Sequence, residues 1–222
     1  MNTKPSDILD FWFGKGAWGT EKMEDPKINS SNMPLWWGFK KDMSGPISKE
    51  EAAAVDASVR AFSSLIRLAG AKKLTGEWET ADGRFAQMLL CDQFSRGAFR
   101  GTDEAFQYDS RAMEICRSLY EDGTYKTYSH GHWSFITTPC QHSEDPKDHE
   151  LCTKIVEFAV SKHGAEAMKI LVDSCKEHTD VVKKFGRYPH RNAIKGRETT
   201  PEEQAWLDDK EHLPKFALAY VK

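Results

Sequence analysis

Three short stretches of the chain place charged side chains beside glycine, proline and aromatic residues. They span residues 91–102, 138–145 and 178–203 of a chain of 222 residues. The guanidinium group of arginine presents a planar fork of N–H donors that fits a carboxylate or a phosphate, and helix N-termini add further donors. We therefore expect these stretches to form a site for a small anion.

The expected ligand-binding residues combine arginine with amide, imidazole and carboxylate side chains. They are Asp92, Gln93, Arg96, Arg100, His178, Arg187, Arg191, Asn192 and Arg197. Within the three stretches Asp92 and Glu144 can neutralise only part of the positive charge. The hypothesis is that the stretches meet in space and that the remaining charge binds a small anionic molecule or the carboxylate of an acidic peptide.

Two other interpretations remain open at the level of sequence. The arginines could form an internal network with Asp92, Asp109 or Glu144, because an unpaired buried charge is costly and structural ion pairs often resemble sites. In that case the protein would be a purely structural, peptide-binding scaffold. Alternatively, the protein could be an enzyme that acts on a small anion, with His142, Glu144 or His190 as the acid or base.

Metal coordination and disulfide formation are not predicted. The eight histidines and five cysteines do not show the paired spacing of a structural zinc site or an H-E-x-x-H helix. We therefore expect no metal and no cofactor. The number of cysteines is odd and no secretory signal precedes them, so free thiols are expected.

Composition limits the possible partners. The formal net charge is −3, which argues against the basic footprint of a nucleic-acid-binding protein. The apolar stretch near the N-terminus is short and is interrupted by Asp7 and Asp10, so it resembles neither a signal peptide nor a membrane span. We expect a cytoplasmic protein that binds neither nucleic acid nor membranes. Its oligomeric state is left open.

Helix caps and apolar stripes predict the elements that position these residues. A capping box at Ser48 and Glu51 opens a helix over residues 48–73, and Thr80 can cap the next helix. Further helices are expected over residues 5–13, from Thr102, from Asp145 to Gly164, from there to residue 185, and from Thr200. No stretch alternates in the manner of a strand. The prediction is an all-α fold in one domain over residues 1–222.

Aromatic residues near the N-terminus are expected to fill the layer between helices, because large aromatic side chains dominate core burial. A box in which they stack on a ligand is the alternative. These residues are Phe11, Trp12, Phe13, Trp36 and Trp37.

Several long motifs resemble the domain of unknown function family 924, a group of uncharacterised and mostly bacterial proteins. They read DFWFG, LLCDQFSRGAFRGTDEAFQYD, PCQHSE and FGRYPHRNAIKGRETTPEE, and they follow the family's order over nearly the whole chain. The chain departs from the family pattern at Ser95, Gly97, Cys140 and Lys195. The resemblance implies a tetratricopeptide-like array of antiparallel helices. The family has no established activity, cofactor or catalytic residue to carry over.

Overall fold

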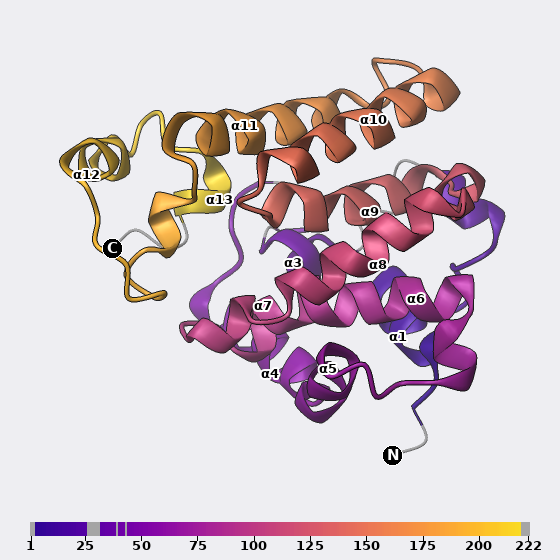
Figure 1. The fold of residues 1–222 in the computed structure, drawn as a ribbon. Coiled ribbons are helices and arrows are strands. Elements are labelled where there is room, and N and C mark those ends of the chain that lie inside the picture. Colours follow the sequence, from indigo (N-terminus) through magenta and orange to yellow (C-terminus); the bar gives the residue numbers. More distant parts are fainter. Residues whose placement is uncertain (1–2, 26–31, 39, 43, 219–222) are drawn as a thin grey trace.

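The computed structural model describes residues 3–25, 32–38, 40–42 and 44–218, except for the side chains of Met33 and Trp37. In this part of the chain every regular element is helical and no strand occurs, which confirms the predicted all-α fold (Figure 1). The single domain and the tetratricopeptide-like arrangement stay predictions. The α-helices are α1 (Pro5–Phe13), α3 (Met33–Trp37), α4 (Lys49–Arg60), α5 (Ser63–Gly70), α6 (Ala81–Leu89), α7 (Ser95–Ala98), α8 (Asp109–Glu121), α9 (His130–His142), α10 (Pro146–His163), α11 (Lys169–Phe185), α12 (Pro201–Asp208) and α13 (Lys215–Leu218).

Shorter helical turns connect these helices. The turn η3 is a π-helix, in which each N–H reaches one residue further back than in an α-helix, and the other turns are 3₁₀-helices. They are η1 (Glu21–Glu24), η2 (Gly76–Glu79), η3 (Leu90–Phe94), η4 (Asp103–Phe106), η5 (Thr124–Thr127) and η6 (Pro189–Arg191).

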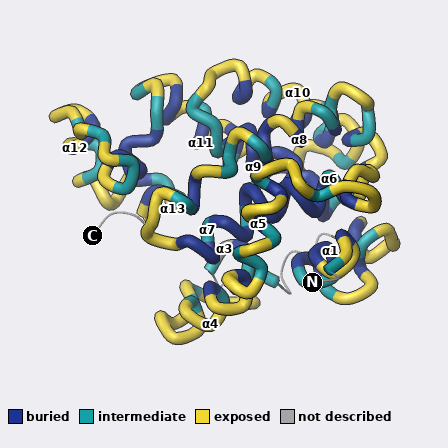
Figure 2. Tube along the Cα trace, turned by 60° about the horizontal axis from the view of Figure 1, so that its bottom comes forward, coloured by how far each residue is buried: buried dark blue, intermediate teal, exposed yellow. Residues whose placement is uncertain are grey.

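The core is built around one helical run and a stack of later helices. Helix α6 continues through η3 into α7 without a break, and it packs against α1 and α8. Helices α8, α9 and α10 each pack against the next helix in the chain, and α11 also packs against α9. Figure 2 shows that buried positions concentrate on the central helices, whereas α4 and α12 at the periphery are mostly exposed.

The predicted caps are largely confirmed. The Ser48 hydroxyl accepts the N–H of Glu51, and the Thr80 hydroxyl accepts the N–H of Gly83. The Asp145 carboxylate caps α10, and Thr200 forms a capping box with its partner three residues later. Because each cap satisfies an otherwise unpaired N–H group, these helix starts can be read from local sequence.

Two predicted helices differ from the structure. The helix over residues 48–73 is divided into α4 and α5 by a turn at residues 61–62, and Phe62 at this turn packs against Phe11 and Phe94 with ring centroids 5.1 and 5.4 Å apart. The helix expected from Thr102 starts there only as the 3₁₀ turn η4, and the α-helix α8 begins at Asp109. The Thr102 hydroxyl donates to the Phe99 carbonyl at 2.7 Å and forms no side-chain cap.

The predicted aromatic layer is present where the structure describes it. Trp12, Phe13 and Trp36 are buried, and the indole N–H of Trp36 donates to the carbonyl oxygen of Trp12 at 2.9 Å. Phe11 is partly buried against the same cluster. The side chain of Trp37 lies outside the described residues. These contacts confirm a packing role for the three buried rings.

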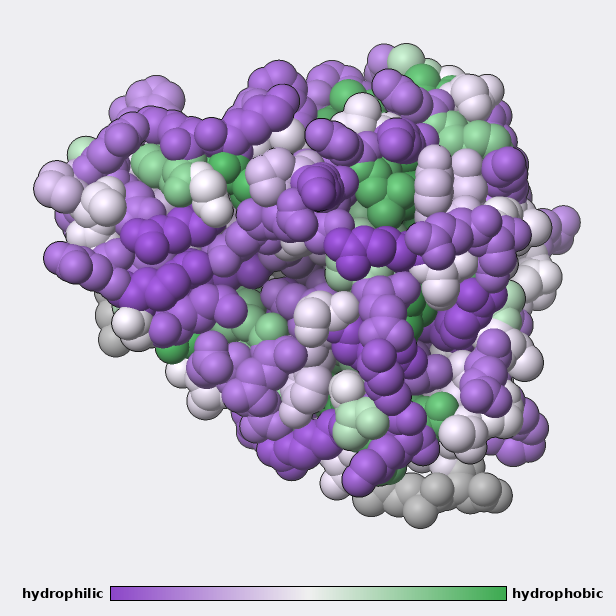
Figure 3. Space-filling view, in the orientation of Figure 1, coloured by the Kyte–Doolittle hydropathy of each residue, from purple (hydrophilic) through white to green (hydrophobic). Residues whose placement is uncertain are grey.

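The face of the molecule in Figure 3 is predominantly hydrophilic, and its hydrophobic patches are small and separated. No helix in the described ranges is long and apolar enough to cross a bilayer. All five cysteines are buried and are free thiols in the structure.

Candidate functional site

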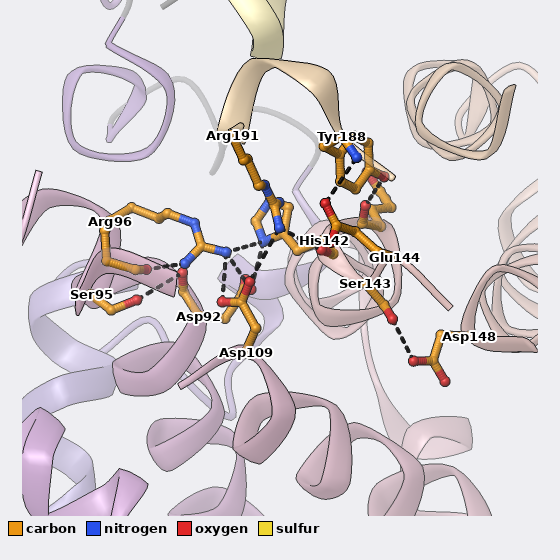
Figure 4. Close-up of polar contacts among 12 residues, drawn as sticks. Asp92, Ser95, Arg96, Asp109, His142, Ser143, Glu144, Asp148, Tyr188 and Arg191 are labelled. Atoms are coloured by element: carbon orange, nitrogen blue, oxygen red, sulfur yellow. Dashed lines mark hydrogen bonds and ion pairs between the residues drawn. The ribbon is translucent and has the colours of Figure 1, made fainter. Parts of the chain in front are cut away.

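A histidine from the end of one helix contacts a buried carboxylate from another (Figure 4). The Nδ1 atom of His142 lies 2.6 Å from Oδ1 of Asp92. Because a carboxylate can only accept a hydrogen bond, Nδ1 carries the proton in this contact. The Nε2 atom of a neutral His142 is then a proton acceptor, and no described residue forms a hydrogen bond with it.

The π-helix η3 places Asp92 in the interior. Its side chain is fully buried, and Gln93 donates to it from the adjacent position at 2.5 Å. The Ser95 hydroxyl donates to the Cys91 carbonyl at 2.7 Å, which supports the backbone at the point where the helix widens. Burial alone would raise the pKa of the Asp92 carboxyl, but His142, followed by Arg96 and Gln93, lowers this pKa below its usual range. Asp92 is therefore a fixed negative charge beneath His142.

Helix α9 reaches His142 despite an internal proline. Pro139 has no N–H to donate to the Phe135 carbonyl four residues earlier. The hydroxyl of Thr138 donates to that carbonyl at 2.9 Å instead. Helix α9 thus continues for one more turn and ends at His142.

The side chains of two arginines point toward Asp109 (Figure 4). Arg96 on α7 places Nη2 2.7 Å from Oδ1 of Asp109 and 3.8 Å from Oδ1 of Asp92. Arg191 on η6 places Nη1 3.4 Å from Oδ2 of Asp109, and the same nitrogen donates to the His142 carbonyl at 2.9 Å. Asp109 is therefore held more closely by Arg96 than by Arg191.

Arg191 is buried but only partly paired. The residue is 4% exposed, and its Nε has no hydrogen-bond partner among the described residues. The guanidinium carbon lies 4.9 Å from the ring centroid of Phe106 and 4.6 Å from that of Tyr188. Burial lowers the pKa of Arg191, while Asp109 acts in the opposite direction. The protein thus leaves part of the hydrogen-bonding capacity of a buried cation unused.

Two cavities meet at His142 and Arg191, which line both of them. The smaller cavity has a volume of about 340 Å³ and lies between η4, α8 and the connection from α9 to α10. The larger cavity has a volume of about 790 Å³ and extends toward α1, α3, α4 and α13. A ligand in either cavity would therefore contact the same histidine and arginine.

The larger cavity gathers several of the predicted binding residues. Those along its wall are Gln93, Arg96, Arg100, His178, His190 and Arg191, with His142 beside them. Asp92 lies behind His142 and belongs to neither lining. Glu144 lines the smaller cavity, where its carboxylate accepts hydrogen bonds from both terminal nitrogens of Arg197 at 2.8 and 3.0 Å. That ion pair lowers the pKa of the Glu144 carboxyl against the effect of burial.

Three other predicted residues line neither of these two cavities. Arg187 donates to both carboxylate oxygens of Glu203 at 2.6 and 2.8 Å, and Asn192 donates to one of them at 3.1 Å. Arg197 donates to the Tyr188 carbonyl in addition to Glu144. The contacts of these residues hold the segment after α11 in place.

Carboxylates from outside the three stretches reduce the expected surplus of positive charge. Arg100 donates to both oxygens of Asp56 on α4 at 2.7 and 2.9 Å. Asp109 is a second such carboxylate. With Glu144 and Glu203 from within the stretches, these carboxylates give each of the five predicted arginines an anionic partner. The expectation that several arginines await an anion is therefore wrong. Arg191 and Arg197 each have a buried Nε without a partner among the described residues, and of these two Arg191 is the one whose side chain is almost fully buried.

The histidines of the larger cavity other than His142 are neutral hydrogen-bonding groups near neutral pH. His178 donates from Nδ1 to the Ser174 carbonyl at 2.8 Å and stacks on Phe216 with ring centroids 3.9 Å apart. Burial, with a contribution from His142, lowers the pKa of His178 to about 3. Burial followed by the charge of Arg191 lowers the pKa of His190 well below its usual value.

Sequence reasoning missed several residues that complete the site. Phe106 and Phe216 carry no charge and were not distinguished from core residues, although Phe106 contacts Arg191 and Phe216 covers His178. Asp56 lies in a sequence that is typical of an ordinary helix, so nothing in the sequence marked it as a residue of the site. The π-helix also leaves no mark in the sequence, although such turns are frequent at functional sites. No group of three or more histidine, cysteine or acidic residues that could hold a metal ion occurs in the described ranges.

The chain is thus an all-helical protein with a histidine–aspartate contact and a buried arginine at the junction of two cavities. It belongs to the DUF924 family, described as bacterial proteins of unknown function, whose model matches residues 8–211. The resemblance inferred from the motifs is confirmed. A solved structure of a protein of unknown function from Agrobacterium tumefaciens is 30% identical, with a TM-score of 0.65, and the match covers 92% of this chain and 97% of that one. Comparison with curated proteins gives no match.

Proposed function

We propose that the larger cavity binds a small organic anion through Arg191. The observation that carries this proposal is the buried Nε of Arg191, which lacks a partner among the described residues although the residue is only 4% exposed. A buried donor without an acceptor costs about 1–3 kcal/mol, and a bound anion would supply the missing acceptor. Because guanidinium–carboxylate hydrogen bonds are charge-assisted, they are stronger than neutral ones.

The charge distribution around Arg191 supports the same proposal. Asp109 lies 2.7 Å from Arg96 and 3.4 Å from Arg191, so its charge mainly compensates Arg96. Asp92 is shared between His142 and Arg96. Arg191 is therefore the cation of this cluster with the weakest compensation, and it lies where both cavities meet.

Thermal denaturation in the presence of small anions tests the proposal. A panel of acetate, benzoate, inorganic phosphate and sulfate is compared on the wild type and on Arg191→Ala, each relative to its own melting temperature without anion. A ligand at a hundred times its Kd stabilises the native state by about 2.7 kcal/mol. We expect this stabilisation in the wild type and its loss in Arg191→Ala.

Arg187→Ala is the matched control, because Arg187 is also paired with a carboxylate but lines neither cavity. This variant should melt at a lower temperature but keep the anion-induced shift. An equal shift in Arg191→Ala and in the wild type would exclude Arg191 as the binding group.

A second candidate function is acid–base catalysis on the bound anion. It is favoured by the contact of 2.6 Å between His142 and Asp92, which leaves Nε2 of His142 to exchange a proton with a ligand. A positioned acid or base contributes about a hundredfold to ten-thousandfold to a rate. In a screen of esters and amides that also carry a free carboxylate, any turnover should fall by that factor in His142→Gln, whereas Arg187→Ala should retain it. Unchanged turnover in His142→Gln would exclude this role.

A further inference from the structure

We infer that the ligand of the larger cavity is a monocarboxylic acid with a hydrocarbon body. Its carboxylate would bind Arg191, and its body would lie against the apolar wall of the cavity. The inference rests on the proposed anion-binding function and names the class of ligand that this site takes.

The wall of the larger cavity is divided by chemistry. Most of its apolar residues come from α1, α3, α4 and α13 and from residues 46–47. Most of its polar residues come from η3, α7, α9, α11 and η6, and Asp56 and Lys215 are the charged residues of α4 and α13. The large apolar side chains are Trp12, Leu35, Trp36, Val55, Val59 and Phe216. An inorganic anion would contact only the polar elements and would leave this apolar surface without a partner.

The size of the cavity agrees with an organic ligand. Its volume of about 790 Å³ falls in the range of about 300–1,000 Å³ that is usual for small-molecule sites. Such sites are mostly apolar, with a few polar groups that fix the orientation of the ligand. Here those groups include Arg191, His142 and the neutral imidazoles of His178 and His190; the other polar residues of the wall are Asp56, Gln93, Arg96, Arg100 and Lys215.

The charges at the polar end favour one negative charge rather than two. Arg96 and Arg191 are balanced by Asp92 and Asp109, so these four side chains have no formal net charge. On the same cavity wall Arg100 is balanced by Asp56, and Lys215 on α13 adds one positive charge. A phosphate dianion would lie close to two carboxylates, whereas a monoanion adds only the charge that the underpaired Arg191 can compensate. The planar guanidinium group also matches the two oxygens of a carboxylate.

Calorimetric titration with a series of straight-chain acids tests the inference. The series consists of acetate, butanoate, hexanoate and octanoate, with octanol and inorganic phosphate as additional probes. Burying one methylene group contributes enough free energy to tighten Kd about threefold to fourfold. We expect Kd to fall by about this factor for each added methylene group until the cavity is filled, and we expect octanol and phosphate to bind more weakly than octanoate.

Two substitutions on α4 separate filling of the cavity from an effect on the helix. Ala52 lines the cavity and is partly exposed, whereas Ala53 on the same helix is exposed and does not line it. Ala52→Phe should raise the Kd of octanoate about tenfold or more and leave acetate unchanged. Ala53→Phe should leave both values unchanged.

The outcomes distinguish this inference from the function on which it rests. If acetate or phosphate binds as tightly as octanoate and binding requires Arg191, the inference is wrong and the anion site remains. If none of the anions binds, or if octanoate and octanol bind equally and Arg191→Ala has no effect, both are wrong. An unchanged Kd for octanoate in Ala52→Phe would also overturn the placement of the hydrocarbon body.

Discussion

His142 and Asp92 are fifty positions apart in sequence, yet Nδ1 of the imidazole lies 2.6 Å from the carboxylate. The contact joins the last residue of α9 to the π-helix between α6 and α7. It links two of the three charged stretches that the sequence singles out. Arg191 links the third stretch to them, because its guanidinium donates to the His142 carbonyl at 2.9 Å.

Asp92→Asn should change the tautomer of His142. The wild-type carboxylate accepts from Nδ1 and fixes the proton there, whereas an amide can turn either its oxygen or its NH₂ group toward the ring. NMR of the imidazole nitrogens should show one tautomer in the wild type and a mixture in the variant. A single unchanged tautomer in Asp92→Asn would mean that the carboxylate does not fix the proton.

Asp109→Ala should destabilise the protein more than Arg191→Ala. Loss of Asp109 leaves Arg191 without its carboxylate and Arg96 with only the more distant Asp92, and breaking a buried ion pair costs about 3–5 kcal/mol. Loss of Arg191 leaves Asp109 paired with Arg96 and deprives mainly the His142 carbonyl of a donor, at a cost of about 1–3 kcal/mol. Urea denaturation of both variants measures the order, and the reverse order would contradict the assigned pairing.

Glu203→Ala should destabilise the C-terminal part of the chain. Glu203 is nearly fully buried and accepts hydrogen bonds from Arg187, Asn192 and the backbone N–H of Thr200. Its loss should cost about 2–4 kcal/mol, because hydrogen bonds to a charged group are worth about 1.5–3 kcal/mol each and solvent can partly replace them. The neighbouring Glu202 is exposed, so Glu202→Ala should change stability by no more than about 0.5 kcal/mol. Similar losses in both variants would disprove the special role of Glu203.

Acid should weaken the fold partly through His178. The pKa of this residue is about 3 in the folded protein, below the usual value of about 6.5 in an unfolded chain. Between these values the unfolded state binds a proton that the folded state does not, so stability decreases as pH falls below about 6.5. One such group contributes a slope of about 1.4 kcal/mol per pH unit.

Urea denaturation at several pH values between about 6.5 and 5 measures this slope. Carboxylates titrate mainly at lower pH, so they contribute little to the slope in the upper part of this range. His178→Gln should reduce the slope by nearly the contribution of one group. His212→Gln should leave it unchanged, because the side chain of His212 is exposed. An unaltered slope in His178→Gln would mean that this imidazole does not remain neutral in the fold.

Local chemistry explains why much of the fold can be predicted from the sequence. The caps at Ser48, Thr80, Asp145 and Thr200 involve partners two or three residues away, so their geometry follows from the helix itself. The break at residues 61–62 could not be predicted in this way. It depends on the packing of Phe62 against rings from α1 and η3, which are distant in sequence.

The sequence by itself determined the helical class, the family and the three stretches from which the site residues come. Residue types and local spacing carry that information, because capping and amphipathic periodicity act over one or two turns. Only the tertiary structure decided which arginines are satisfied. Asp56 lies 44 residues from Arg100, and Asp109 lies 82 residues from Arg191. Such pairs form only when folding brings the two side chains within hydrogen-bonding distance. The same contacts left the buried Nε of Arg191 without an acceptor in the part of the chain that the structure describes.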